Sequence, residues 1–279
     1  MDSLATQVTV DSLKNTHSES GGSWILHHVM DGNYLDFTPF GKIYLPHLEI
    51  FGFDISITRH VVFMWLAAIL LTYVFIKVAK SYQNSLVPKG STNFWEVFIV
   101  FVRDEIAKPT IGKGYERFLP YLLTAFFFIL FGNFLGLIPF SATFTSNIAV
   151  TATLATMSFL VIQLGGIKNN GFLGYFKGLI PHGVPVFLLP IMVVVELLGL
   201  FTKPFALAIR LFANMTAGHI VIYALISLIF VMQSYLISPV SIGMALFIYG
   251  LEVLVALLQA YIFTMLSSLF IGMAVHQEH

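Results

Sequence analysis

The sequence predicts an all-α membrane protein with five transmembrane helices and one amphipathic interfacial helix. Hydrophobic residues make up 57% of the 279 residues and charged residues only 10%, a composition far from that of soluble domains. Several apolar runs reach the length of about 20 residues that a helix needs to cross a bilayer. The chain has no cysteine, hence no disulfide framework, and its net charge of zero gives no indication of nucleic-acid binding.

Residues 1–58 are predicted to form a mostly irregular extension ahead of a membrane domain over residues 59–279. The first part of the extension is polar and without periodicity, and the rest mixes aromatic residues with prolines and glycines, which is typical of short loops and a short helix. His27 and His28 could bind a metal as a pair. Adjacent residues do not share a helix face, however, and no ligand cluster lies nearby, so solvated histidines are the favoured interpretation.

The first predicted span covers residues 59–78. Further along, apolar residues recur at helical spacing over residues 93–111, and Asn93 followed by Glu96 has the pattern of a helix N-terminus. Five charged side chains make this helix too polar to span: Glu96, Arg103, Asp104, Glu105 and Lys108. We expect it to lie at the membrane surface, with packing against a partner as the alternative.

Residues 118–138 and 147–164 are predicted to form a hairpin of two spans, the first of them ended by Pro139. Asn133 lies inside the first span, and threonines are spread along the second. Threonines in membrane helices usually bond the carbonyl groups of the preceding turn, although they can also line a water path.

The last two apolar stretches, residues 186–231 and 239–275, are too long for one upright crossing each. The first would extend roughly 69 Å as a helix, against a hydrocarbon core of ~30 Å. Tilting, kinks at Pro190 and Pro204, or a second crossing would absorb the excess length.

Charge placement predicts the orientation of the chain. Residues 1–58 hold seven acidic and two basic residues, whereas residues 77–117 hold seven basic and four acidic residues. The positive-inside rule therefore places the extension outside and the 77–117 segment inside. Five crossings then put the C-terminus inside and the uncharged link over residues 139–146 outside.

The most informative residue is Arg210, which lies between long apolar runs within residues 196–219. An arginine at the centre of a membrane helix costs at least ~2.5–3.5 kcal/mol, so it marks a functional site by default. Snorkelling to the headgroups is the alternative, but it requires a position near a helix end. With a turn of about 100° per residue, small and polar residues share the arginine's face: Lys203, Ala206, Ala213, Asn214 and Ala217. His219 points about 180° away.

Few ionisable residues are expected at membrane depth, and they form no catalytic pair: Glu196, Lys203, Arg210, His219 and Glu252. Gln259 follows Glu252 by seven positions and so lies on the same helix face. The sequence contains no nucleotide-binding, zinc-protease or serine-hydrolase motif and indicates no cofactor. This inventory is typical of a proton path rather than of an enzyme.

Two segments resemble subunit a of the F-type rotary ATP synthases: residues 196–219, with RLFANMTAGH at their centre, and residues 252–263. The resemblance covers nearly the whole chain and is weak only in the first 50 residues. It implies a non-catalytic stator whose last two helices are single, strongly tilted and near-horizontal against a rotating ring of c subunits. It also implies peripheral-stalk b subunits, other ATP synthase subunits and membrane lipids as partners. Protons are the predicted coupling ion because His219 can relay them, with sodium as the alternative.

By this resemblance, Arg210 is the essential arginine that attracts the carboxylate of an arriving c subunit and separates two offset half-channels. The small-residue face would contact the ring: Lys203, Ala206, Ala213 and Ala217. His219 and Glu252 correspond to the pair lining the outer half-channel, in exchanged order relative to some members of the family.

The resemblance also assigns the remaining polar residues to the proton path. Glu196 corresponds to a carboxylate of the inner half-channel, and Asn214 and Gln259 to polar neighbours of the arginine. Asn133 corresponds to a polar position of the second span. For Asn133 and Gln259, a hydrogen bond across helices is the alternative role.

Two other functional classes remain as alternatives. A secondary transporter would place intramembrane charges around a solute, but such folds usually show internal repeats, and the two long stretches are not alike. An intramembrane enzyme would need a nucleophile or metal pattern. The long outer extension and the positive inner loop favour a bacterial inner membrane, whereas the order of His219 and Glu252 also resembles mitochondrial inner-membrane members.

Overall fold

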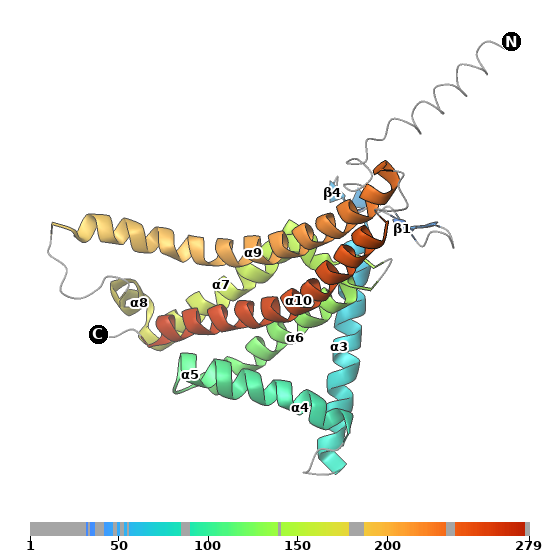
Figure 1. Ribbon diagram of the computed structural model, residues 1–279. Coiled ribbons are helices and arrows are strands. Elements are labelled where there is room, and N and C mark those ends of the chain that lie inside the picture. The colour runs from blue at the N-terminus through green and yellow to red at the C-terminus, as the bar shows by residue number, and fades with distance from the viewer. Residues whose placement is uncertain are drawn as a thin grey trace, which may run out of the picture.

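Five helices in the described part of the chain are long and apolar enough to cross a membrane, which confirms the predicted class. The computed structural model describes residues 32, 34–36, 42–46, 49–50, 53–54, 56–84, 90–138, 141–178, 187–232 and 238–276. Figure 1 shows α3 (Arg59–Asn84) standing upright at one side, while the other spanning helices run across it.

The predicted polar helix is present as three consecutive helical segments: α4 (Ser91–Phe101), the π-helical η1 (Val102–Ala107) and α5 (Lys108–Ile111). The N-terminal assignment of Asn93 is wrong. The helix begins earlier because Gly90, with φ of 61°, turns the chain into it without any side-chain cap.

The segment η1 carries one apolar and one charged face. Val102, Ile106 and Ala107 are fully buried, and η1 packs against α6 (Leu119–Gly136) and α10 (Ser238–Val275). On the charged face of η1, two hydrogen bonds of 2.9 and 2.8 Å join the Arg103 guanidinium to Asp104 and hold the pKa of that carboxyl group below its usual value. The amphipathic pattern thus serves packing against the chain's own helices.

The two central spans are α6 and α7 (Ile148–Asn170), and α7 is followed by the short α8 (Phe172–Gly178). The link between α6 and α7, described from residue 141 onwards, is not an exposed loop. It contains the 3-10 turn η3 (Phe144–Ser146), and Phe144 and Thr145 have no exposed surface. A side chain at Gly132 would overlap Phe144, and one at Gly136 would overlap Thr143. These two glycines of α6 therefore leave space for the link.

The two long stretches form single helices, α9 (Leu189–Met232) and α10. They pack along each other and run side by side in opposite directions (Figure 1). Pro190 lies in the first turn of α9, where proline is tolerated, and Pro204 lies inside the helix. The excess length is therefore not absorbed by a second crossing.

Small residues let α10 approach its neighbours closely. A side chain at Gly272 would overlap the backbone of Thr110 in α5, and the Thr110 and Ser268 hydroxyl oxygens are 2.6 Å apart. Ser267 accepts a 2.8 Å hydrogen bond from Ser158 of α7. Close backbone approach and hydroxyl hydrogen bonds stabilise helix packing where lipid leaves little hydrophobic driving force.

Within residues 1–58, the described part forms two short antiparallel pairs rather than a helix. β1 (Tyr34–Asp36) pairs with β2 (Lys42–Tyr44), and β3 (Glu49–Ile50) pairs with β4 (Phe53–Asp54). Aromatic and β-branched residues in these pairs favour extended backbone. The histidines at positions 27 and 28 lie outside the described residues.

Candidate functional site

Arg210 lies on α9 at the border between a buried and an exposed face. Leu207, Ala208, Leu211 and Met215 are at most 5% exposed and face the rest of the chain. Ala206, Ala213 and Ala217 of the predicted small-residue face are all exposed. The Arg210 side chain is partly buried, and within the described residues no carboxylate lies within 4 Å of it. Ionisable residues within membrane-spanning segments are rare and usually mark functional positions.

One turn beyond Arg210, Asn214 donates a 2.9 Å hydrogen bond from Nδ2 to Oε1 of Gln259 on α10. Asn214 is exposed, whereas Gln259 is only 2% exposed. The bond crosses between the two long helices, as the alternative role for Gln259 requires. It also places an amide group on the same part of α9 as the arginine.

Glu252 of α10 is 6% exposed, and its carboxylate packs directly against Gly218 of α9. A side chain at Gly218 would overlap that carboxylate. Both carboxylate oxygens are buried, and no hydrogen-bond partner for them lies within the described residues. A buried polar group without a partner costs free energy, so its presence indicates a role other than stability.

His219, the residue after Gly218, is held by the link between α6 and α7. Its Nε2 atom lies 2.6 Å from the hydroxyl oxygen of Thr143. The Glu252 carboxylate of α10 contacts α9 at Gly218, and His219 is the next residue of α9. Two titratable side chains are therefore present at adjoining positions of α9. Sequence reasoning identified the histidine but not Thr143.

Asn133 is fully buried in α6 and has both ends of its amide bonded. Its Oδ1 atom accepts a 2.7 Å hydrogen bond from Thr145, and its Nδ2 atom donates a 3.3 Å bond to the carbonyl group of Ala256 on α10. The residue thus connects α6, the link and α10, which is the alternative role foreseen for it.

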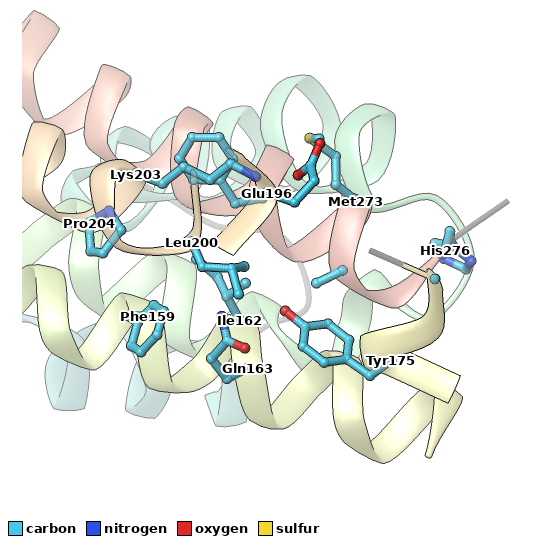
Figure 2. Close-up of a pocket in the computed structure, with 13 residues that line it drawn as sticks. Phe159, Ile162, Gln163, Tyr175, Glu196, Leu200, Lys203, Pro204, Met273 and His276 are labelled. Carbon is cyan, nitrogen blue, oxygen red and sulfur yellow. The ribbon is translucent and has the colours of Figure 1, made fainter. Parts of the chain in front are cut away.

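A pocket of about 380 Å³ lies between α7, α8, α9 and α10, at the N-terminal end of α9. Figure 2 shows Glu196 and Lys203 on one side of it and Gln163 and Tyr175 on the other. The Nζ atom of Lys203 lies 5.2 Å from the centre of the Phe270 ring, close enough for a cation–π interaction. Lys203 therefore points into this pocket rather than sharing the open face with the alanines.

The predicted polar residues thus form two groups on either side of Arg210 along α9. Glu196 and Lys203 lie toward its N-terminal end, and Glu196 is about 21 Å from the arginine along the axis. His219 lies about 14 Å beyond the arginine in the other direction, with Glu252 and Thr143 beside it. Within the described residues, no group of three His, Cys, Asp or Glu side chains could hold a metal ion.

Comparison with known proteins gives a consistent result. The family described as "ATP synthase A chain" matches residues 61–272. The chain is 57% identical to "ATP synthase subunit a" of Chloroherpeton thalassium, over 91% of this chain and 77% of that protein. It is 53% identical to "ATP synthase subunit a 2" of Chlorobaculum tepidum, over 92% and 74% of the two chains. It is 48% identical to "ATP synthase subunit a" of an Anaeromyxobacter species, over 94% and 73%.

Proposed function

This chain belongs to the ATP synthase subunit a family, and from that premise we propose that it is the proton-channel stator of an F-type ATP synthase. In this proposal, two offset half-channels deliver protons to and from carboxylates of a c-subunit ring, so that proton flow drives rotation and ATP synthesis. The chain is a membrane subunit of the complex and not its catalytic subunit. The observation that carries the proposal is Arg210, which has no carboxylate partner among the described residues and lies beside an exposed alanine face.

The proposed role of Arg210 follows from the chemistry of its side chain. A guanidinium group stays protonated under all relevant conditions, so it cannot carry a proton itself. Facing a c-subunit carboxyl group, it favours the ionised form and so promotes release of the proton. A fixed cation between two aqueous paths also blocks direct leakage, and each charge crossing the membrane supplies ~2.3 kcal/mol per 100 mV.

Two groups of residues support the two half-channels. The outer path would use His219 and Glu252, which adjoin at Gly218. The inner path would use the pocket lined by Glu196 and Lys203. Because Arg210 lies between these groups along α9, a proton could pass from one to the other only on the ring.

The proposed rotor-facing surface is the exposed alanine face: Ala206, Ala213 and Ala217. Small side chains allow another helix to approach closely, which a ring passing the arginine requires. Other proposed partners are the b subunits of the peripheral stalk, further ATP synthase subunits and membrane lipids.

The chain is a multi-pass membrane protein with bacterial relatives. We place it in a bacterial inner membrane, with the N-terminus on the periplasmic side and the C-terminus in the cytoplasm. The excess of basic residues over residues 77–117 supports this orientation.

Replacing the arginine tests the proposal. In membrane vesicles containing the complete ATP synthase, Arg210→Ala should abolish proton-driven ATP synthesis and open a passive proton leak through the membrane sector. Arg103→Ala, which removes an arginine paired with Asp104 away from the proposed path, should keep both properties normal. ATP synthesis retained in Arg210→Ala would refute the assigned role.

A further inference from the structure

The link between α6 and α7 is a polar junction in which three hydroxyl side chains contact three different helices. Thr143 bonds His219 of α9, Thr145 bonds Asn133 of α6, and Ser146 lies 3.3 Å from His60 of α3. Ala142 to Thr145 are at most 5% exposed, although the sequence is that of an uncharged connection. This arrangement connects residues of the proposed outer path to three helices.

Thr143 makes the contact that bears most directly on proton transfer. It is 3% exposed, and its hydroxyl oxygen lies 2.6 Å from Nε2 of His219. A hydroxyl group can donate to a neutral imidazole nitrogen and can accept from a protonated one. The same contact can therefore persist whether or not the ring carries the extra proton.

The backbone of Thr143 is fixed from two sides. Ser146 donates a 2.6 Å hydrogen bond to the Thr143 carbonyl group, and the buried His60 contacts the same serine hydroxyl. On the other side, Gly136 of α6 leaves the space that the Thr143 side chain occupies. A partner held in this way restricts the orientation of the imidazole ring.

We propose that Thr143 is a positioning residue of the outer proton path, which fixes the His219 ring and stays bonded to it through protonation and release. This inference rests on the proposed function, which assigns His219 to that path. Other ionisable groups surround the path and contribute to its pH dependence. Among the described residues they include Glu252 of α10, Arg59 and His60 of α3, and Tyr223 of α9, which interacts electrostatically with both Glu252 and Arg59. Tyr249 of α10 also reaches the link, where it donates a 2.9 Å hydrogen bond to the Leu137 carbonyl group.

The test compares Thr143→Val, which removes the hydroxyl at nearly constant volume, with Thr143→Ser, which keeps it. ATP-driven proton pumping would be measured across a range of pH in inverted vesicles with the complete enzyme, normalised to the amount of assembled complex. Thr143→Val should lower the rate about tenfold, which corresponds to the loss of one hydrogen bond. It should also displace the pH profile, and Thr143→Ser should restore both.

Thr151→Val is the matched control, because this fully buried threonine bonds only the carbonyl groups of its own helix within the described residues. It should leave the rate and profile unchanged. A normal rate and pH profile in Thr143→Val, or a loss proportional only to poorer assembly, would overturn the inference. Arg210→Ala separates the two claims. ATP synthesis retained in Arg210→Ala would refute the proposed function, whereas a normal Thr143→Val beside an inactive Arg210→Ala refutes only the role of Thr143.

Discussion

Gly218 shows how one missing side chain shapes the site. The Glu252 carboxylate occupies the space where a Cβ atom would lie. Gly218→Ala should therefore displace that carboxylate from its position against Gly218. We expect proton pumping by the complete enzyme to fall roughly tenfold or more, since small misplacements of reacting groups have large effects on rate.

Gly174→Ala is the control for this prediction, because Gly174 lies in α8, off the face of α9 that carries Arg210, and the nearest heavy atom to the new Cβ would be the Asn170 Cβ at an ordinary contact distance of 3.9 Å. It should pump normally. Equal pumping by the Gly218 and Gly174 variants would show that the carboxylate can move without consequence, contrary to the role given to Glu252.

The second residue-level prediction concerns the pair His219 and Glu252. Each single exchange, His219→Glu or Glu252→His, leaves two groups of one kind and should lower ATP synthesis about a hundredfold, as expected for loss of an acid–base partner. The double exchange keeps one carboxyl group and one imidazole, so it should retain more synthesis than either single variant. If the double variant made no more ATP than the single variants, the site would require each group at its own position, and one carboxyl group plus one imidazole would not be sufficient.

At the scale of single residues, sequence reasoning found the charged and amide groups but missed their hydroxyl partners. Arg210, His219 and Glu252 stand out because ionisable residues are rare in apolar runs. Thr143 and Thr145 do not, because threonine is common in membrane helices and usually bonds its own backbone. The direction of Lys203 was also missed, since a long flexible side chain can leave the face on which its backbone lies.

At the scale of elements, the link between α6 and α7 is the feature that most distinguishes the fold from a bundle with external loops. Its aromatic residue Phe144 is fully buried over Gly132 of α6. Gly132→Ala should overpack this contact and destabilise the complex by ~1–3 kcal/mol, the usual effect of an extra methyl group in a packed core. A lower thermal unfolding temperature of the purified complex would measure it.

Gly243→Ala provides the comparison, because no heavy atom lies within 4 Å of the added Cβ and alanine favours the helix. It should match or exceed the wild-type unfolding temperature. If Gly132→Ala were equally stable, Phe144 would have to be able to move away from α6, and the link would not be the fixed element described above.

Among the elements of the described residues, the five helices that are long and apolar enough to cross a membrane could be predicted, because length and hydropathy determine them. The buried link could not, because a short uncharged segment between two spans has no periodicity. One signal was available, because Gly132 and Gly136 lie four residues apart, a spacing typical of close contacts between helices. Here the two glycines contact the link between α6 and α7 and not another helix. The start of α4 was missed because Gly90, and not a polar cap, begins it.

At the scale of the whole molecule, the two long helices leave much of their surface uncovered. In the most apolar segment of α6, half of the residues are buried within the chain, whereas in the corresponding segment of α9 only 11% of the residues are buried. As a 44-residue helix, α9 would be about 66 Å long and would lean by roughly 60° to stay within a ~30 Å core. Its wide angle to α3 in Figure 1 is compatible with such a lean.

The overall arrangement could be predicted only in part. Hydropathy gave the number of crossings, but the lengths of α9 and α10 left tilting, kinking and double crossing open. The periodicity of the sequence cannot decide among tilting, kinking and double crossing, because both helices carry apolar side chains on every face. The face proposed to meet the ring was predicted from small and charged residues, not from hydrophobicity, since lipid-facing and protein-facing surfaces are equally apolar.

The central claim is that the face of α9 carrying Arg210 meets the moving ring, and disulfide trapping tests it most directly because the chain has no cysteine. A cysteine at the exposed Ala213 would be paired, in the assembled enzyme, with a cysteine placed next to the ionisable carboxyl residue of the c subunit. Thr156→Cys, on an exposed position of α7, is the comparison. We expect rapid crosslinking that blocks ATP synthesis from position 213 and none from position 156, whereas crosslinking from position 156 alone would contradict the account.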